Sequence, residues 1–317
     1  DAGALRSRSG DNVWNGNVTL NTARIGVDAD STLTVNGQMS GSGVFSKIGA
    51  GTIILTAENA YTGETQIRAG ALQLAGGPNR LNTAGNMRIE GGTFDLNGQN
   101  QILNKLILAG GGRVELNNGA TLTVNSGDFW PYSGVVITGS GRLVKIGTGF
   151  ITFGATTATY TGGTFIEQGT LHLYGGNNKL PATGDVTISS SGTLNLAHTN
   201  QPATEQTIGG LFGSGTVSIP VTGQKVNFIV GNDNRAGSFS GVLQNGDGTL
   251  SVTKKGLDTL ELGGASTYTG GTIVDAGTLL VSNAVGSATG SGSVTVHQYA
   301  TLGGTGRIGG AVTVDHD

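Results

Sequence analysis

Residues 139–176 read GSGRLVKIGTGFITFGATTATYTGGTFIEQGTLHLYGG, and similar stretches occur twice more, at residues 41–77 and 246–283. Each copy contains Tyr-Thr-Gly, here residues 160–162, and a glycine follows nine residues after the tyrosine. In two of the three copies apolar and polar residues then alternate, as in residues 170–173, which is the period-2 pattern of a strand with one buried face. The repeated stretch therefore predicts short strands separated by glycine turns.

Strands of three to five residues cannot bury a core within one hairpin, so they need similar strands stacked above and below them. The linking segments, residues 78–126 and 177–230, also resemble each other, for example in residues 82–89 and 181–188. We therefore expect each large unit to contain about four or five coils of roughly 20–25 residues, which is within the range of solenoid repeats. The pattern predicts an all-β solenoid.

Composition excludes several functional classes. The 317 residues include 59 glycines, 5 prolines and no cysteine, and the formal net charge is −3 with 12% charged residues. No basic run suggests nucleic-acid binding, and no apolar run approaches the length of a membrane span. The lack of cysteine excludes disulfides and thiolate metal sites. With no initiator methionine and no signal peptide, the chain is expected to be a processed fragment of a longer protein.

The pattern GSGxLxKxGxGxLxL, followed by Tyr-Thr-Gly-Gly-Thr and Gly-Thr-Leu, resembles the passenger-associated transport repeat of Gram-negative autotransporters, the type V secretion family. Residues 139–176 match best, with Lys145, Gly147 and Gly169-Thr170-Leu171 in place. The first copy departs from the pattern at Glu64, and the third departs at Asp247 and two further positions. The glycine-rich segment 302–314 is similar to the region that leads into the last passenger coils in this family.

The resemblance implies a passenger fragment over residues 1–317, folded as a single-stranded right-handed parallel β-helix of about 13–15 coils and roughly 60–70 Å long. It implies display at the bacterial cell surface after export across the outer membrane. Membrane attachment would be only through a translocator barrel beyond Asp317. The expected core residues are Leu55, Leu72, Leu74, Phe94, Leu96, Leu122, Val124, Leu171, Leu173, Leu194, Leu196, Leu262 and Leu279.

Residues that could carry chemistry are scattered. No Gly-x-Ser-x-Gly nucleophile motif occurs, and the four histidines are not at metal-ligand spacing (His172, His198, His297 and His316). Asp28 and Asp30 only faintly resemble a calcium loop, because the glycine and glutamate of that loop are missing. We therefore expect no catalytic residue, no cofactor and no metal site.

Two residue types recur in all three copies. The lysines, Lys47, Lys145 and Lys254, lie several coils apart, so a solvated face is the favoured interpretation. The tyrosines of the Tyr-Thr-Gly motif could form a binding stripe, but packing over a turn is favoured. The best candidate for a contact site is the run 129–132, in which Phe129, Trp130 and Tyr132 could present an apolar anchor to a partner or fold back over a coil.

These observations favour a non-enzymatic, surface-exposed virulence factor that acts in adhesion, aggregation or host-protein binding. Its partner would be a host cell-surface or extracellular protein, or another passenger through self-association, and not nucleic acid. Two alternatives remain open. The fragment could be the structural stalk of a longer passenger that carries an enzymatic domain upstream, or it could be a polysaccharide-active β-helix enzyme.

Overall fold

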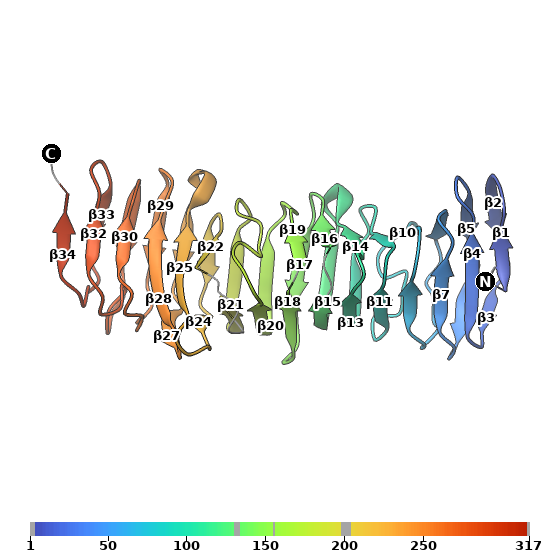
Figure 1. Cartoon of the computed structure of the whole chain (residues 1–317), viewed down its shortest axis with the longest axis horizontal. Coiled ribbons are helices and arrows are strands. Elements are labelled where there is room, and N and C mark those ends of the chain that lie inside the picture. The colour runs from blue at the N-terminus through green and yellow to red at the C-terminus, as the bar shows by residue number, and fades with distance from the viewer. Residues whose placement is uncertain (1–3, 130–133, 155, 198–203, 316–317) are drawn as a thin grey trace. The chain divides into compact units, whose positions relative to one another are not determined.

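Short parallel strands joined by turns form the protein in the computed structural model, which describes residues 4–129, 134–154, 156–197 and 204–315. Within these ranges the chain is an all-β parallel solenoid of about 14 turns with no α-helix, as the repeats predict (Figure 1). No helix in the described part of the chain is long and apolar enough to cross a membrane. The right-handed sense of the solenoid stays a prediction.

The chain divides into two compact units, of which unit 1 comprises residues 1–144 and 154–162. An eight-stranded sheet in unit 1 has the order β19-β16-β14-β12-β10-β8-β5-β2. A second face pairs β1-β4-β7-β9-β11-β13-β15 in succession, and β3 pairs with β6. The strands are β1 Leu5–Ser7, β2 Asp11–Trp14, β3 Val18–Leu20, β4 Ala23–Val27, β5 Thr32–Val35, β6 Met39–Gly41, β7 Phe45–Ile48, β8 Thr52–Leu55, β9 Thr65–Ile67, β10 Ala71–Leu74, β11 Asn86–Ile89, β12 Thr93–Asp95, β13 Gln101–Leu108, β14 Arg113–Glu115, β15 Thr121–Phe129, β16 Val135–Thr138 and β19 Thr156–Ala158, with a 3-10 turn at Asn117–Gly119.

Unit 2 comprises residues 145–153 and 163–317, and β17 (Arg142–Lys145) spans the boundary. A six-stranded sheet in unit 2 has the order β22-β25-β28-β30-β32-β34. A second face pairs β18-β20-β21-β23-β26-β29-β31-β33, and β24 pairs with β21 and β27. The strands are β18 Phe150–Phe153, β20 Thr164–Leu173, β21 Val186–Asn195, β22 Glu205–Thr207, β23 Leu211–Gly213, β24 Thr216–Ile219, β25 Lys225–Val230, β26 Gly237–Phe239, β27 Val242–Gly246, β28 Thr249–Lys254, β29 Thr259–Leu262, β30 Thr272–Val274, β31 Thr278–Val281, β32 Val294–Val296, β33 Thr301–Gly304 and β34 Val312–Val314, with a 3-10 turn at Asn232–Asn234.

In-register pairing stacks like residues into continuous columns. In unit 1, Leu33, Ile53, Leu72, Phe94 and Val114 occupy one register position on five successive strands, and all five are buried. Because each of these side chains packs on the one above and the one below, the column forms a core that no single coil could form. All thirteen core residues expected from the sequence are buried, which confirms the inward assignment of those strands.

The repeated glycine after each Tyr-Thr-Gly is required by its backbone. Gly70, Gly169 and Gly277 have φ of +64°, +74° and +64°. A Cβ at Gly70 would lie 2.2 Å from the carbonyl oxygen of Gly51 in the preceding coil. A side chain at this position would therefore be strained and would also push the coils apart.

Candidate functional site

The three repeated lysines lie inside the solenoid, so the expectation of a solvated face was wrong. Lys47, Lys145 and Lys254 are 0%, 1% and 0% exposed. Each Nζ donates hydrogen bonds to two carbonyls of its own turn and to one carbonyl of the following coil. For Lys47 these acceptors are Ile48 and Gly49 at 3.0 and 2.6 Å, and Ala69 at 3.0 Å.

An ammonium group has three N–H donors, and here three carbonyl oxygens accept them. Burial lowers the pKa of Lys47 and of Lys145 to about 8, and it also lowers the pKa of Lys254. In every copy the acceptor in the following coil is the residue just before the repeated glycine: Ala69, Gln168 and Ala276. The lysines therefore fasten adjacent coils together at the glycine turn.

The repeated tyrosines are also internal, which confirms the packing role over the binding stripe. Tyr61 and Tyr268 are 2% and 0% exposed. Their hydroxyls lie 2.6 Å from Oγ1 of Thr65 and Thr272, the last residue of each Tyr-Thr-Gly-x-Thr motif. Burial raises the pKa of both phenols. The motif spacing thus pairs a buried hydroxyl with a buried partner in each case.

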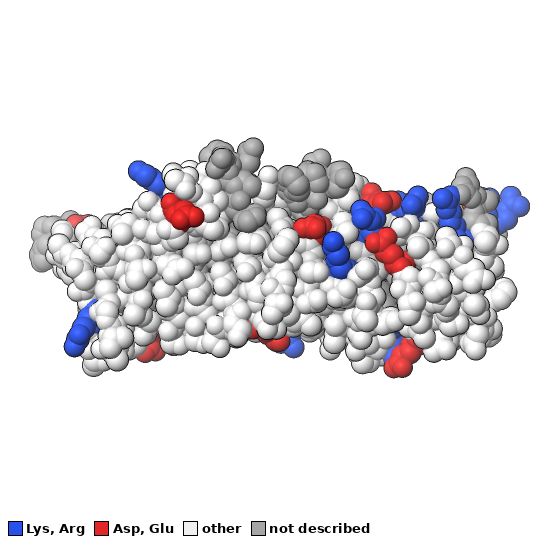
Figure 2. Space-filling view, turned by 90° about the horizontal axis from the view of Figure 1, so that it is seen from below, with Lys and Arg blue, Asp and Glu red and all other residues white. Residues whose placement is uncertain are grey.

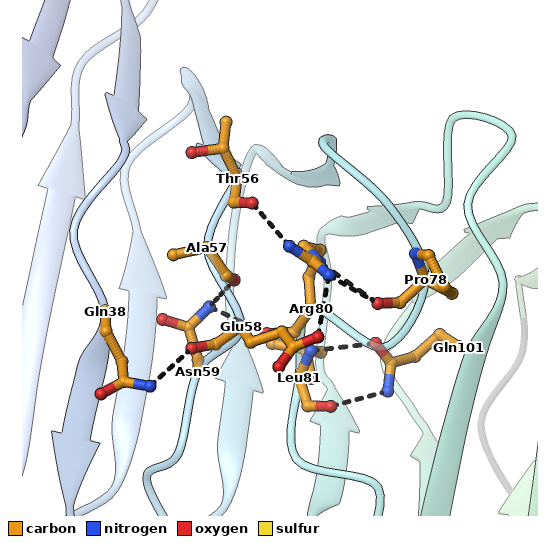
Figure 3. A network of polar contacts seen from close by, with 9 residues as sticks. All are labelled: Gln38, Thr56, Ala57, Glu58, Asn59, Pro78, Arg80, Leu81 and Gln101. Carbon is orange, nitrogen blue, oxygen red and sulfur yellow. Dashed lines mark hydrogen bonds and ion pairs between the residues drawn. The ribbon is translucent and has the colours of Figure 1, made fainter.

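Buried amides form a further set of contacts between coils that the sequence analysis missed. In unit 1, Oε1 of Gln101 accepts the Leu81 N–H at 3.0 Å, and Nε2 donates to the carbonyl of Leu81 (Figure 3). Nε2 also donates to the carbonyl of Ile102. Asn59 similarly accepts the Met39 N–H at 2.7 Å. In unit 2, Gln206 accepts the Lys179 N–H at 2.8 Å and donates to Thr207.

Arg80 closes the loop beside Gln101 in the same region of unit 1. Its guanidinium donates to the carbonyls of Thr56 and Pro78, both at 2.9 Å, and contacts Glu58 at 3.3 Å (Figure 3). The Arg80 side chain is 12% exposed, whereas that of Glu58 is 76% exposed. The arginine therefore serves mainly to satisfy backbone carbonyls, and Glu58 remains at the surface.

The aromatic run was the predicted contact site. Phe129 ends β15 and is fully buried, so this ring belongs to the core of unit 1. Trp130 and Tyr132 lie outside the described residues. Binding through this motif stays a prediction that rests on those two aromatic residues.

Three of the residues considered as possible ligands, His172, His297 and Asp28, have ordinary partners. His172 contacts Asn195 at 3.0 Å, and His297 lies 3.0 Å from Asp275 and 3.7 Å from Asp315. His198 and His316 lie outside the described residues. Asp28 forms an ion pair with Arg6 at 2.8 Å. In the described ranges no group of three or more His, Cys, Asp or Glu side chains could hold a metal ion.

On the side of the molecule drawn in Figure 2, charged side chains are unevenly distributed along the chain. Unit 1 has interleaved acidic and basic side chains, including Arg68 with Glu90 at 3.6 Å and Arg88 with Glu64 at 3.8 Å. Figure 2 shows charged side chains gathered over this part of the chain, while most of the visible surface of unit 2 is uncharged. Because such exposed pairs contribute little to stability, their placement matters mainly for what the surface can contact.

Unit 2 has a hollow of about 340 Å³ over the outer face of β25, β28, β30 and β32. Its lining is rich in hydroxyl and amide groups and contains no charged side chain. Thr253, Ile273 and Thr295 share one outward register position on successive strands, and Asn227 pairs in register with Ser251. This hollow, with its uncharged lining, is a candidate binding site on the outer face of β25, β28, β30 and β32.

The fold and the repeated residues define the class of the protein as an all-β parallel solenoid whose three repeats each contain a buried lysine, a buried tyrosine and a glycine with positive φ. The family model described as Passenger-associated-transport-repeat matches residues 45–74, 143–173 and 252–281. The chain belongs to the autotransporter passengers with these repeats. This class is exported across the outer membrane to the cell surface.

Two curated proteins illustrate the relationship. The chain is similar to "Adhesin BmaC autotransporter" of Brucella suis biovar 1 (strain 1330), with 31% identity over 256 residues, 75% of this chain and 7% of the relative. It is also similar to "Probable autotransporter YfaL" of Escherichia coli (strain K12), with 28% identity over 273 residues, 77% of this chain and 21% of the relative. The chain thus spans only a small part of either relative. No solved structure gives a significant match.

Proposed function

We propose that this segment is a non-enzymatic passenger that acts in adhesion at the bacterial surface, by binding a host protein or by self-association. The observation that carries the proposal is that the inward and outward faces of the strands have different roles. The repeated lysine, tyrosine and amide side chains point inward and bind backbone or core partners. Around the hollow of unit 2, the outward positions are occupied mostly by neutral hydroxyl and amide groups.

An outward face with neutral polar groups is suited to binding a partner molecule. Neutral hydroxyl and amide groups form hydrogen bonds with a partner without the large desolvation cost of charged groups. Many such groups held at fixed spacing on strands form a pre-organised surface, which reduces the entropy lost on binding. One of the two relatives is named an adhesin, which supports the same interpretation.

The test uses beads coated with the purified protein. We expect these beads to bind cultured host cells, or to cluster with one another, more strongly than albumin-coated beads. If neither cell binding nor clustering occurs over a range of salt concentrations, adhesion by this segment is refuted. Release of reducing ends from polysaccharides by the purified protein would contradict the non-enzymatic part of the proposal.

A second function, that of a structural stalk, is favoured by the contacts that join successive coils. Lysine and amide side chains form hydrogen bonds with backbone groups of a neighbouring coil and so hold the column together, as a spacer requires. A stalk predicts that beads coated with this segment do not bind, while beads coated with a longer form of the protein that includes it do bind.

A further inference from the structure

We propose that the hollow over β25, β28, β30 and β32 binds a neutral saccharide. This inference deepens the proposed adhesion and rests on it, because it names the class of ligand that one face of unit 2 recognises. Three features carry it: the shape of the floor, the free hydrogen-bonding groups, and the lack of charge in the lining.

Two glycines in the turn before β30 line the hollow without projecting a side chain into it. Gly270 and Gly271 lie in the coil between those of Ser251 and Ser293, and all four residues line the hollow. A Cβ at Gly271, where φ is +86°, would lie 3.0 Å from the backbone oxygen of Ser293. A side chain is therefore excluded at Gly271, and the hollow is bounded here by backbone and by the side chains of Ser251 and Ser293.

The groups around this space offer both donors and acceptors. Oδ1 of Asn227 accepts hydrogen bonds from Ser251 at 3.4 Å and from Thr253 at 3.1 Å, which fixes the orientation of its amide. Within the described residues, Nδ2 of Asn227 and the hydroxyls of Ser293 and Thr295 form no hydrogen bond with the protein. Vicinal hydroxyl groups of a sugar, each both donor and acceptor, match this mixed set.

The uncharged lining and the volume of the hollow restrict the class of ligand that it can bind. None of the residues that line the hollow is charged, so nothing there would compensate a sulfate, phosphate or carboxylate. Ile273 is 39% exposed and provides an apolar contact for the C–H face of a sugar ring. A volume of about 340 Å³ is near the lower end of ligand pockets, which fits one or two rings of a longer glycan.

The experiment measures binding of the purified protein to an array of oligosaccharides composed of neutral hexoses and N-acetylhexosamines, with sialylated and sulfated glycans as separate arms. The double variant Ser293→Ala/Thr295→Val removes two free hydroxyls from the hollow. Its matched control, Ser291→Ala/Thr278→Val, removes the same atoms from positions outside the hollow. We expect the unaltered protein and the control to bind neutral glycans, and we expect the double variant to have a Kd about tenfold higher.

The outcomes separate this inference from the proposed function. A flat array, binding to acidic glycans alone, or equal Kd values for the double variant and its control would refute the saccharide site. If coated beads still bind host cells in that event, adhesion stands and only the ligand class is wrong. If the beads also fail to bind or cluster, both proposals are refuted.

Discussion

Replacing Lys145 by methionine tests whether the buried lysines hold the coils together. Methionine keeps an unbranched apolar stem but removes all three N–H donors. In the structure Nζ of Lys145 donates to the carbonyl oxygens of Ile146 at 2.5 Å, Gly147 at 2.7 Å and Gln168 at 3.1 Å. The substitution therefore leaves three buried acceptors without this donor while barely changing the volume of the core.

The size of the effect follows from two opposing contributions. Hydrogen bonds to a charged group contribute about 1.5–3 kcal/mol each to the free energy of unfolding. The desolvation of the ammonium, which lowers the pKa of Lys145 to about 8, offsets part of this sum. We therefore expect Lys145→Met to lower the free energy of unfolding by about 2–4 kcal/mol.

Urea unfolding followed by far-ultraviolet circular dichroism measures this change, and amide hydrogen exchange locates it along the chain. Lys225→Met is the matched control, because Lys225 is exposed on β25 and its side chain forms no hydrogen bond or ion pair with another described residue. We expect this control to stay within about 0.5 kcal/mol of the unaltered protein. If Lys145→Met and Lys225→Met have the same unfolding midpoint, the coil-joining role of the lysine is wrong.

Three further predictions use the same urea titration. Tyr268→Phe leaves the buried hydroxyl of Thr272 without its phenol partner and should lower the free energy of unfolding by about 1–2 kcal/mol; an unchanged midpoint would count against the pairing. Gln101→Leu orphans a buried backbone N–H and should lower it by about 2–4 kcal/mol, with faster amide exchange at that turn as the local readout. Stability should also depend on pH. The pKa of Lys47 and of Lys145 is about 8 in the folded protein against 10.5 for a free lysine, so the unfolded chain binds more protons between these values. The free energy of unfolding should therefore rise as the pH increases from about 8 to about 10, and a Lys47→Met/Lys145→Met variant should show a smaller rise.

The core of the solenoid could be predicted from the sequence because its signal is local. Leu72 and Leu74 are separated by one polar residue, which places both on one face of a strand, and both are buried. The same alternation of inward and outward residues also indicates that the repeated lysine is buried. Lys47 lies two residues after Phe45 on β7, so both point inward, and the structure buries both. The charge of lysine favoured solvent, but three carbonyls in a glycine turn outweigh that preference.

The interior amides could not be predicted in this way, because their partners lie about a coil away in sequence. Gln101 binds the backbone of Leu81, 20 residues earlier, and no pattern within β13 reveals the vacant N–H in the earlier turn. The position of Phe129 was ambiguous for another reason, because the aromatic run could either present an apolar anchor to a partner or fold back over a coil. In fact β15 continues through Gly127 to Phe129, and the ring lies in the core.

The bond from each lysine to the following coil has a consequence for how such chains gain or lose length. Lys47, Lys145 and Lys254 reach acceptors that lie 22, 23 and 22 residues downstream. The spacing differs by one residue between copies, so the turns between a lysine and its acceptor can absorb small changes in length while the bond is kept. Natural or engineered insertions should therefore be tolerated in these turns, whereas an insertion within the strand that carries a lysine, or directly before its acceptor, would move the ammonium away from that carbonyl.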